Sequence, residues 1–141
     1  MFTTILVAMF VASSADLSEE AKKELKAMEG DWTVVAMATD GKDRELPVDE
    51  QIAVTVKGKM FTFGKFGDGE VTAIDPTLKP KIVDFKMLRK PESGVTNEGI
   101  FKLEKDTLTV VVYLGEDTKR PANFEIPEDA KTIRFTLKRA K

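Results

Sequence analysis

The chain has 141 residues, with 22 Lys and Arg against 24 Asp and Glu, and it contains neither Cys nor His. This length fits one domain. A hydrophobic fraction of 42% with 33% charged residues is typical of a globular protein. Without Cys and His the chain has no disulfide, no zinc finger and no Ser-His-Asp or Cys-His catalytic group. The charges alternate in sign without a basic block, so we expect no nucleic-acid partner.

The first 15 residues form a separate apolar segment. Residues 2–11 are uncharged and mostly apolar, and small residues at 12–15 precede the polar Asp16. An apolar run of about ten residues is too short to span a bilayer and suits the core of a signal peptide. Ser13 and Ala15 have the spacing that a signal peptidase accepts. We therefore expect residues 1–15 to be a signal peptide and residues 16–141 to form a single secreted or periplasmic domain without a transmembrane segment. A start codon placed too early and a buried N-terminal segment are the alternatives, because no Lys or Arg precedes the apolar run.

A short helix is expected at the start of this domain. Asp16 or Ser18 can cap it, and Glu19 and Glu20 in its first turn suit the positive end of the helix dipole. An apolar stripe follows at steps of four, four and three residues, formed by Leu17, Ala21, Leu25 and Met28. Gly30 is the expected C-cap. The helix is most simply a lid over a core, and a partner-binding helix is the alternative.

Eight strands with turn residues between them are expected after this helix. Alternating apolar and polar residues place them at 32–39, 52–57, 60–65, 70–75, 81–88, 98–103, 107–114 and 131–139. Short connections in chain order favour an all-β fold, a small eight-stranded antiparallel up-and-down barrel of the lipocalin-like kind, which removes exposed edges by closing. A two-sheet sandwich is the alternative.

A series of short motifs extends from Leu25 to the end of the chain. In order they are Leu25, Gly30-Asp31-Trp32, Asp40-Gly41-Lys42, Ile74-Asp75-Pro76-Thr77, Lys79-Pro80-Lys81, Asp84, Gly99-Ile100-Phe101, Leu103, Asp106-Thr107-Leu108, Arg120-Pro121, Phe124 and Leu137-Lys138-Arg139. The series resembles an uncharacterised lipocalin-like (calycin-type) domain family of planctomycete bacteria. The resemblance implies a barrel and export, and it implies no activity because the family has none assigned. Relatives often carry a Cys in the seventh strand and a Ser/Gly-rich stretch after the Arg-Pro motif, and this chain departs from both patterns.

Closure of the barrel predicts a contact between its first and last strands. The Gly-x-Trp motif also resembles the opening of lipocalins. In a closed barrel of eight antiparallel strands the last strand pairs with the first, so Arg139 should lie beside Trp32 and point inward. A guanidinium over the indole ring is worth on the order of 1–2 kcal/mol at a partly desolvated site. We therefore expect Gly30, Trp32 and Arg139 to be structural residues of the barrel floor.

No motif specifies a chemistry, so we expect no enzyme activity, no cofactor and no metal. Asp75 and Asp84 flank the loop at 76–80, and two close carboxylates can divide acid and base roles. A turn hydrogen bond by Asp75 before Pro76 is the favoured interpretation. Asp68 and Glu70 match only a fragment of a calcium loop and are interpreted as a turn.

The long irregular stretch at 115–130 supplies the candidate ligand-binding residues, which are Arg120, Asn123 and Phe124. Long loops in compact domains are often functional. Pro121 and Phe124 can also simply hold the loop on the barrel, and this interpretation is favoured.

Two functions remain, and the inward residues decide between them. The side chains expected to point inward include only two small ones on the first strand, Ala36 and Ala38. They also include six large rings, which are Trp32, Phe61, Phe63, Phe85, Phe101 and Phe135. Rings of this size nearly fill an eight-stranded lumen. This favours a filled barrel that acts as a non-enzymatic structural or protein-interaction domain with an unknown protein partner. The alternative is a lipocalin-like binder of a small apolar ligand at the open end, which an apolar cavity on the order of several hundred Å³ would favour.

Overall fold

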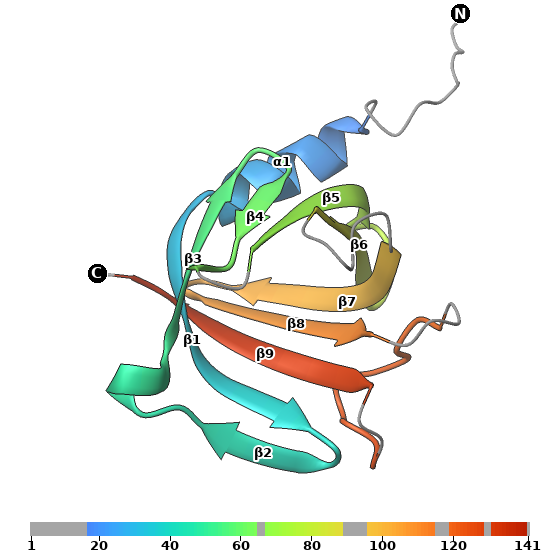
Figure 1. Ribbon diagram of the computed structural model, residues 1–141. Coiled ribbons are helices and arrows are strands. Elements are labelled where there is room, and N and C mark those ends of the chain that lie inside the picture. Colours follow the sequence, from blue (N-terminus) through green and yellow to red (C-terminus); the bar gives the residue numbers. More distant parts are fainter. Residues whose placement is uncertain (1–16, 65–66, 89–95, 115–118, 129–130, 141) are drawn as a thin grey trace, which may run out of the picture.

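The computed structural model describes residues 17–64, 67–88, 96–114, 119–128 and 131–140, so the expected signal peptide at 1–15 lies outside the described residues. The strands form a closed eight-stranded antiparallel barrel with one short α-helix, which confirms the predicted fold class (Figure 1). The elements in chain order are α1 (Glu19–Met28), β1 (Gly30–Thr39), β2 (Lys42–Glu45), the 3₁₀ turn η1 (Val48–Glu50), β3 (Ile52–Lys57), β4 (Met60–Thr62), β5 (Asp68–Asp75), β6 (Lys81–Met87), β7 (Thr96–Glu104), β8 (Thr107–Tyr113) and β9 (Thr132–Arg139).

The barrel closes through β1 and β9, the first and last strands. Each strand from β3 to β8 pairs with the next one in the chain. β9 pairs with β1, and Trp32 lies opposite Arg139. The other edge of β1 is shared, because residues 30–34 pair with β3 and residues 36–39 pair with β2. This continuous antiparallel ring replaces the two-sheet sandwich that was the alternative.

A β-bulge in β1 changes which of its side chains face the lumen. The register with β9 shifts between Val34 and Ala36, where β1 also changes its other partner. Beyond the shift, Met37 lies opposite Phe135 and Ala38 lies opposite Arg134. Side chains alternate along a strand, and a bulge inserts one residue, so every later residue is moved to the other face. The prediction that Ala36 and Ala38 point inward is therefore wrong, and Met37 takes the inward position.

Strand β2 was not expected from the sequence. Its four residues are charged and exposed, so they show none of the apolar alternation that marks a half-buried strand. β2 pairs with β1 alone, and charges on such a short edge oppose pairing with another chain.

Other strand boundaries also differ from expectation. The strand expected at 60–65 ends at Thr62, ahead of Gly64 with a φ of +52°. Strand β5 begins at Asp68, so Asp68 and Glu70 lie in a strand rather than in the expected turn.

Helix α1 covers the end of the barrel at which β1 begins. Ser18, one of the two predicted caps, caps it, because its hydroxyl oxygen accepts a hydrogen bond from the Ala21 amide at 3.1 Å, and Asp16 lies outside the described residues. Its buried face consists of Ala21, Leu25 and Met28, as the apolar stripe predicted. Glu29 is the C-cap, and Gly30 is already the first residue of β1 with a φ of +125°. The predicted C-cap at Gly30 is thus one residue too late.

The floor beneath α1 is built on Trp32 and Arg139. Trp32 is 1% exposed, and its Nε1 donates to the Met28 carbonyl at 2.7 Å. The Arg139 Cζ lies 4.2 Å from the centre of the indole, which confirms the predicted stacking. The same guanidinium donates from Nη1 to Glu29 O and from Nη2 to Ala27 O, both at 2.9 Å. A cation here also suits the negative end of the helix dipole. Arg139 therefore joins β9, β1 and the end of α1.

Candidate functional site

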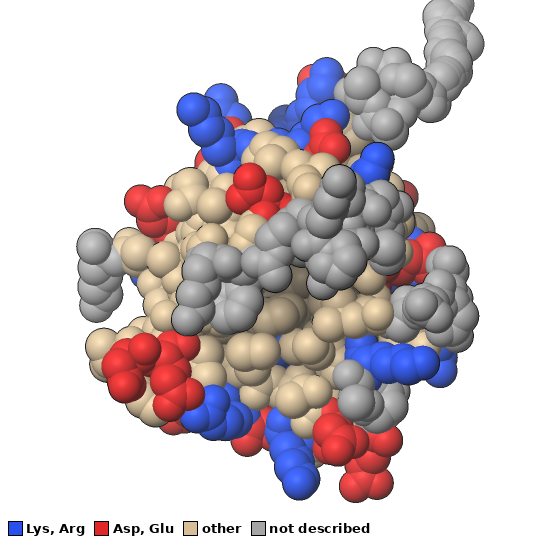
Figure 2. Space-filling view, viewed as in Figure 1, with Lys and Arg blue, Asp and Glu red and all other residues tan. Residues whose placement is uncertain are grey.

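The end of the barrel opposite α1 contains a cavity of about 290 Å³ that opens to solvent. Figure 2 shows a hollow in the middle of this face, and the described side chains that border it are uncharged. All the described residues that line the cavity are apolar except Asn97. The apolar ones are Met37, Ile52, Phe61, Phe63, Phe85, Val110, Val112, Leu114, Phe135 and Leu137. None of these side chains carries a charge. The site is thus an apolar chamber with a single polar side chain.

The chamber exists because four of the aromatic rings pack along its wall instead of across it. Phe61 contacts Phe63 at 6.2 Å and Phe85 at 5.1 Å between ring centres, and Phe63 lies 6.3 Å from Phe135. Aromatic pairs favour such offset and edge-on contacts. The wall of β7 and β8 carries smaller residues there, including Gly99 with Val110 and Val112.

The expectation that rings nearly fill the lumen therefore holds only for the closed end. Trp32 and Phe101, each 1% exposed, are both in the packed core. At the open end the lumen is hollow. The number of inward rings in the sequence gives the volume that they occupy. It does not show that the rings pack against one another along one side of the lumen.

Asn97 is a site residue that the sequence did not indicate. It lies in β7, beside Phe85 of β6, and is 6% exposed. Its Nδ2 donates to the Tyr113 carbonyl at 3.2 Å. The expected strand began at Glu98, which left Asn97 in the preceding loop. The strand alternation continued backwards from Phe101 and Gly99 would have placed Asn97 on the inward face.

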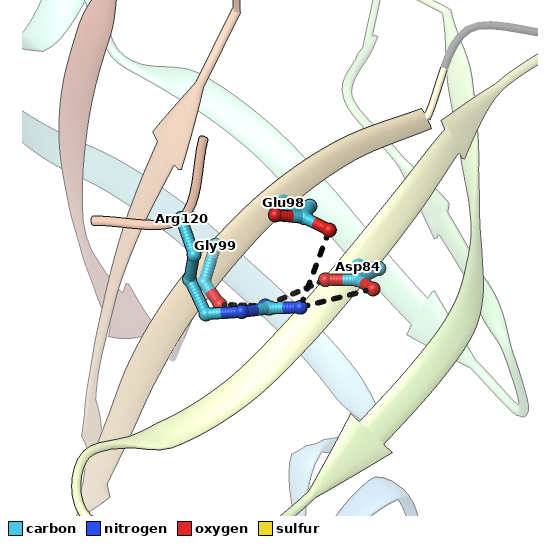
Figure 3. A network of polar contacts seen from close by, with 4 residues as sticks. All are labelled: Asp84, Glu98, Gly99 and Arg120. Atoms are coloured by element: carbon cyan, nitrogen blue, oxygen red, sulfur yellow. Dashed lines mark hydrogen bonds and ion pairs between the residues drawn. The ribbon is translucent and has the colours of Figure 1, made fainter. Parts of the chain in front are cut away.

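Arg120, a predicted ligand-binding candidate, lies on the outside of the barrel (Figure 3). Its Nη1 donates to Asp84 Oδ1 at 2.7 Å and to Gly99 O at 2.9 Å, and its Nη2 donates to Asp84 Oδ2 at 3.3 Å. Nη2 is also 3.6 Å from Glu98 Oε2. Asp84 and Glu98 are directly opposite in the β6–β7 ladder, where like charges repel. Arg120 compensates both carboxylates and fixes its own loop to the wall.

The other two candidates, Asn123 and Phe124, belong to the same outer segment, residues 119–128. Asn123 Oδ1 accepts from the Glu125 amide at 2.9 Å in a local turn. The Phe124 carbonyl accepts from Arg134 Nη1 at 2.8 Å, and the Phe124 ring lies 5.0 Å from Lys102 Nζ.

The three candidates therefore lie apart from the apolar chamber. Arg120 and Asn123 line a second hollow of about 390 Å³ between segment 119–128 and the outer wall. The contacts of the segment agree with the favoured interpretation, in which it is held on the barrel.

Asp75 and Asp84 have separate partners. Asp75 Oδ1 accepts from the Thr77 hydroxyl at 2.6 Å and from the Thr77 amide at 2.9 Å, which confirms the predicted turn. These two hydrogen bonds, the hydroxyl one foremost, lower the pKa of Asp75 because they stabilise its ionised form. Asp84 lies opposite Ala73 in the ladder and faces Arg120. The two carboxylates do not form an acid–base pair.

Three further observations concern what the chain resembles and contains. Within the described ranges, no group of three acidic side chains is placed to hold a metal ion. The described part of the chain also has no helix that combines the length and the apolar character needed to cross a membrane. Comparisons with protein-family models, curated proteins and solved structures gave no significant match. The resemblance to the planctomycete lipocalin-like family stays a prediction.

Proposed function

We propose that the protein is a non-enzymatic binding protein that holds a small apolar ligand in the open end of its barrel. The observation that carries this proposal is the 290 Å³ chamber with one polar side chain among its described lining residues. Ligand sites are typically concave, largely apolar and preformed, with a few placed polar groups. An apolar cavity also offers water few hydrogen-bond partners, so an apolar ligand enters it without displacing well-bound water.

The volume of the chamber sets the size of the ligand. An engineered apolar cavity of about 150 Å³ binds benzene. A chamber of about 290 Å³ therefore suits a compound of roughly 12 non-hydrogen atoms, about the size of a substituted naphthalene. Such a ligand reaches the chamber from the open end, because α1 and the Trp32–Arg139 floor cover the other end.

The role expected from the sequence, a structural or protein-interaction domain, is the alternative. A contiguous apolar patch on the outside would favour it. Among the described residues the exposed large apolar side chains are Val48, Leu78, Leu88 and Leu114, which belong to four different connections and to both ends of the barrel. Single exposed apolar side chains are normal for a protein surface. Export of the protein is also part of our proposal, and the apolar segment at 2–11 supports it.

Naphthalene binding tests the proposed function. We expect saturable binding at one site per chain, measured by fluorescence titration and by native mass spectrometry. Val112→Trp fills the chamber from its wall and should abolish binding. Thr62→Trp adds the same side chain on an exposed position outside the barrel and should leave binding unchanged.

Two outcomes would contradict the proposal. One is the absence of naphthalene binding to the folded wild-type protein, and the other is equal binding by both variants. Protein purified from its own host should also carry a small molecule in a one-to-one ratio, visible in the native mass spectrum.

A further inference from the structure

Asn97 is the one polar side chain among the described residues that line the chamber. Its amide orientation is fixed by its partner. The Tyr113 main-chain carbonyl can only accept a hydrogen bond, so the group 3.2 Å from it must be the NH₂ of Asn97. The side-chain carbonyl oxygen, Oδ1, is then the end of the amide that remains for other contacts. Oδ1 can accept a hydrogen bond but cannot donate one.

Oδ1 of Asn97 is not fully buried. No donor of the described residues reaches it, whereas every buried side-chain nitrogen or oxygen in that part of the chain has a hydrogen-bond partner. An oxygen without a partner is therefore not fully buried, and the residue that carries it lines the chamber. Asn97 as a whole is only 6% exposed, so few waters can reach Oδ1 once an apolar ligand occupies the chamber. A ligand without a donor would leave this acceptor unpaired, which is unfavourable in an apolar site.

The chamber offers nothing to a charged group. Its described lining residues have no Lys, Arg, Asp or Glu. Arg134 and Arg120, from the strands and connection next to the chamber, make their contacts on the outer wall, with Asp43 and with Asp84. A carboxylate or an ammonium group would lose its hydration on entry and find no opposite charge, and burial of an unpaired charge is strongly unfavourable.

We infer that the ligand is a neutral, apolar alcohol or phenol whose single hydroxyl group donates a hydrogen bond to Oδ1 of Asn97. This inference rests on the proposed function. It adds to it by naming the chemical class of the ligand and the residue that selects for the hydroxyl group. Asn97 is a specificity residue here, and the apolar wall supplies the rest of the binding free energy.

Four naphthalene derivatives test this inference on the wild-type protein. They are 2-naphthol, 2-methylnaphthalene, 2-methoxynaphthalene and 2-naphthoate at pH 7. Each dissociation constant is corrected for the transfer of the compound from water to alkane, so that only contacts beyond simple burial remain. After this correction 2-naphthol should bind at least about tenfold more tightly than the methyl and methoxy compounds, which have no donor. The carboxylate should bind at least about tenfold more weakly than 2-naphthol without correction.

A variant tests whether Asn97 causes the preference for the hydroxyl compound. In Asn97→Leu the corrected advantage of 2-naphthol over 2-methylnaphthalene should disappear, while 2-methylnaphthalene still binds. Thr62→Leu makes the same kind of change on the outside of β4 and should keep the advantage. If Asn97→Leu does not fold, the wild-type comparison of 2-naphthol with its methyl ether still decides the question.

The two proposals fail in different ways. Equal corrected binding of the hydroxyl, methyl and methoxy compounds would overturn the inference and leave the proposed function intact. Tighter binding of the carboxylate than of 2-naphthol would do the same. Absence of binding by all four compounds would overturn the proposed function and the inference together.

Discussion

At the scale of single residues, Arg139 is the side chain on which most contacts of the closed end converge. It stacks on Trp32, donates to two carbonyls at the end of α1, and lies 3.1 Å from the position that a Cβ on Gly30 would occupy. Gly30 is therefore required twice, by its φ of +125° and by the guanidinium beside it. Arg139 side-chain exposure is 31%, so its hydrogen bonds are only partly screened by water.

Replacement of Arg139 tests this convergence. Arg139→Met should lower the free energy of unfolding by about 2–3 kcal/mol, because it removes the stacked cation and two charged hydrogen bonds but keeps a long apolar side chain. Arg44→Met is the matched control, since Arg44 makes one exposed ion pair with Glu50, and it should cost less than about 1 kcal/mol. Urea denaturation followed by the fluorescence of the one Trp measures both. Equal losses in the two variants would show that Arg139 is an ordinary surface residue.

The contact between Arg139 and Trp32 could be predicted from the sequence because two simple rules were enough. Strand alternation gives the inward face of Arg139, and closure of the barrel brings its strand to β1. Neither rule gives the contacts of Arg120, and alternation gives the inward face of Asn97 only if the strand is extended back past Glu98. The partners of Arg120 depend on the path of an irregular connection over the outer wall. Asn97 lies at a strand end, where propensity does not fix the boundary.

At the scale of elements, segment 119–128 forms a second layer outside the barrel. It contacts Asp84 of β6, Lys102 of β7 and Arg134 of β9, and Glu128 lies against Gly41 of the β1–β2 turn. Residues with outward parity on the central strands are nevertheless buried, among them Ile100 and Val111 at 1% and 0% exposure. The segment therefore accounts for apolar residues on both faces of β8, whose run of Thr and Val shows no alternation.

Loss of the Arg120 contacts should loosen this layer. Arg120→Met should destabilise the protein by about 2–3 kcal/mol and speed amide exchange in 119–128, because Asp84 and Glu98 are then left facing each other without a cation. Adding Glu98→Gln to Arg120→Met should recover part of that loss by removing the repulsion. Hydrogen exchange with mass spectrometry and urea denaturation measure these effects. A double variant less stable than Arg120→Met would contradict the account of two opposed carboxylates.

The elements also show where sequence patterns stop being informative. The boundaries of β3 match the prediction because Ile52, Val54 and Val56 alternate with small or polar residues in a strand exposed on one face. The bulge in β1 has no such signal, since Val34 to Ala38 are all apolar and fit either face. β2 has no apolar residue, so nothing in its pattern distinguishes it from a loop.

At the scale of the whole molecule, the barrel is divided into a packed half and a hollow half. The packed half contains Trp32, Val34 and Phe101, whereas the hollow half has contacts only along its wall. Few buried contacts correspond to a low local opening free energy. We therefore expect the half that contains the chamber to open more easily.

Amide exchange along single strands tests this division. In β1 and β9 the amides near Trp32 and Lys138 should exchange more slowly than those near Met37 and Ile133. Saturation with 2-naphthol should slow exchange mainly at the open end, because a ligand stabilises the region that it contacts. Residue-resolved hydrogen exchange by NMR measures both effects. Uniform slowing along both strands would mean that the two halves open together.

The pairing of β9 with both β8 and β1 has a consequence for how the chain is made. During synthesis β1 can pair early with β2 and β3, but its second edge has no partner until the residues up to Arg139 have left the ribosome. Contacts so distant along the chain form slowly, since the intervening loop must first be closed. The nascent polypeptide therefore remains an unsealed sheet until β9 has emerged. Until β9 is made, the chain can therefore still pass through a narrow pore in an unfolded form.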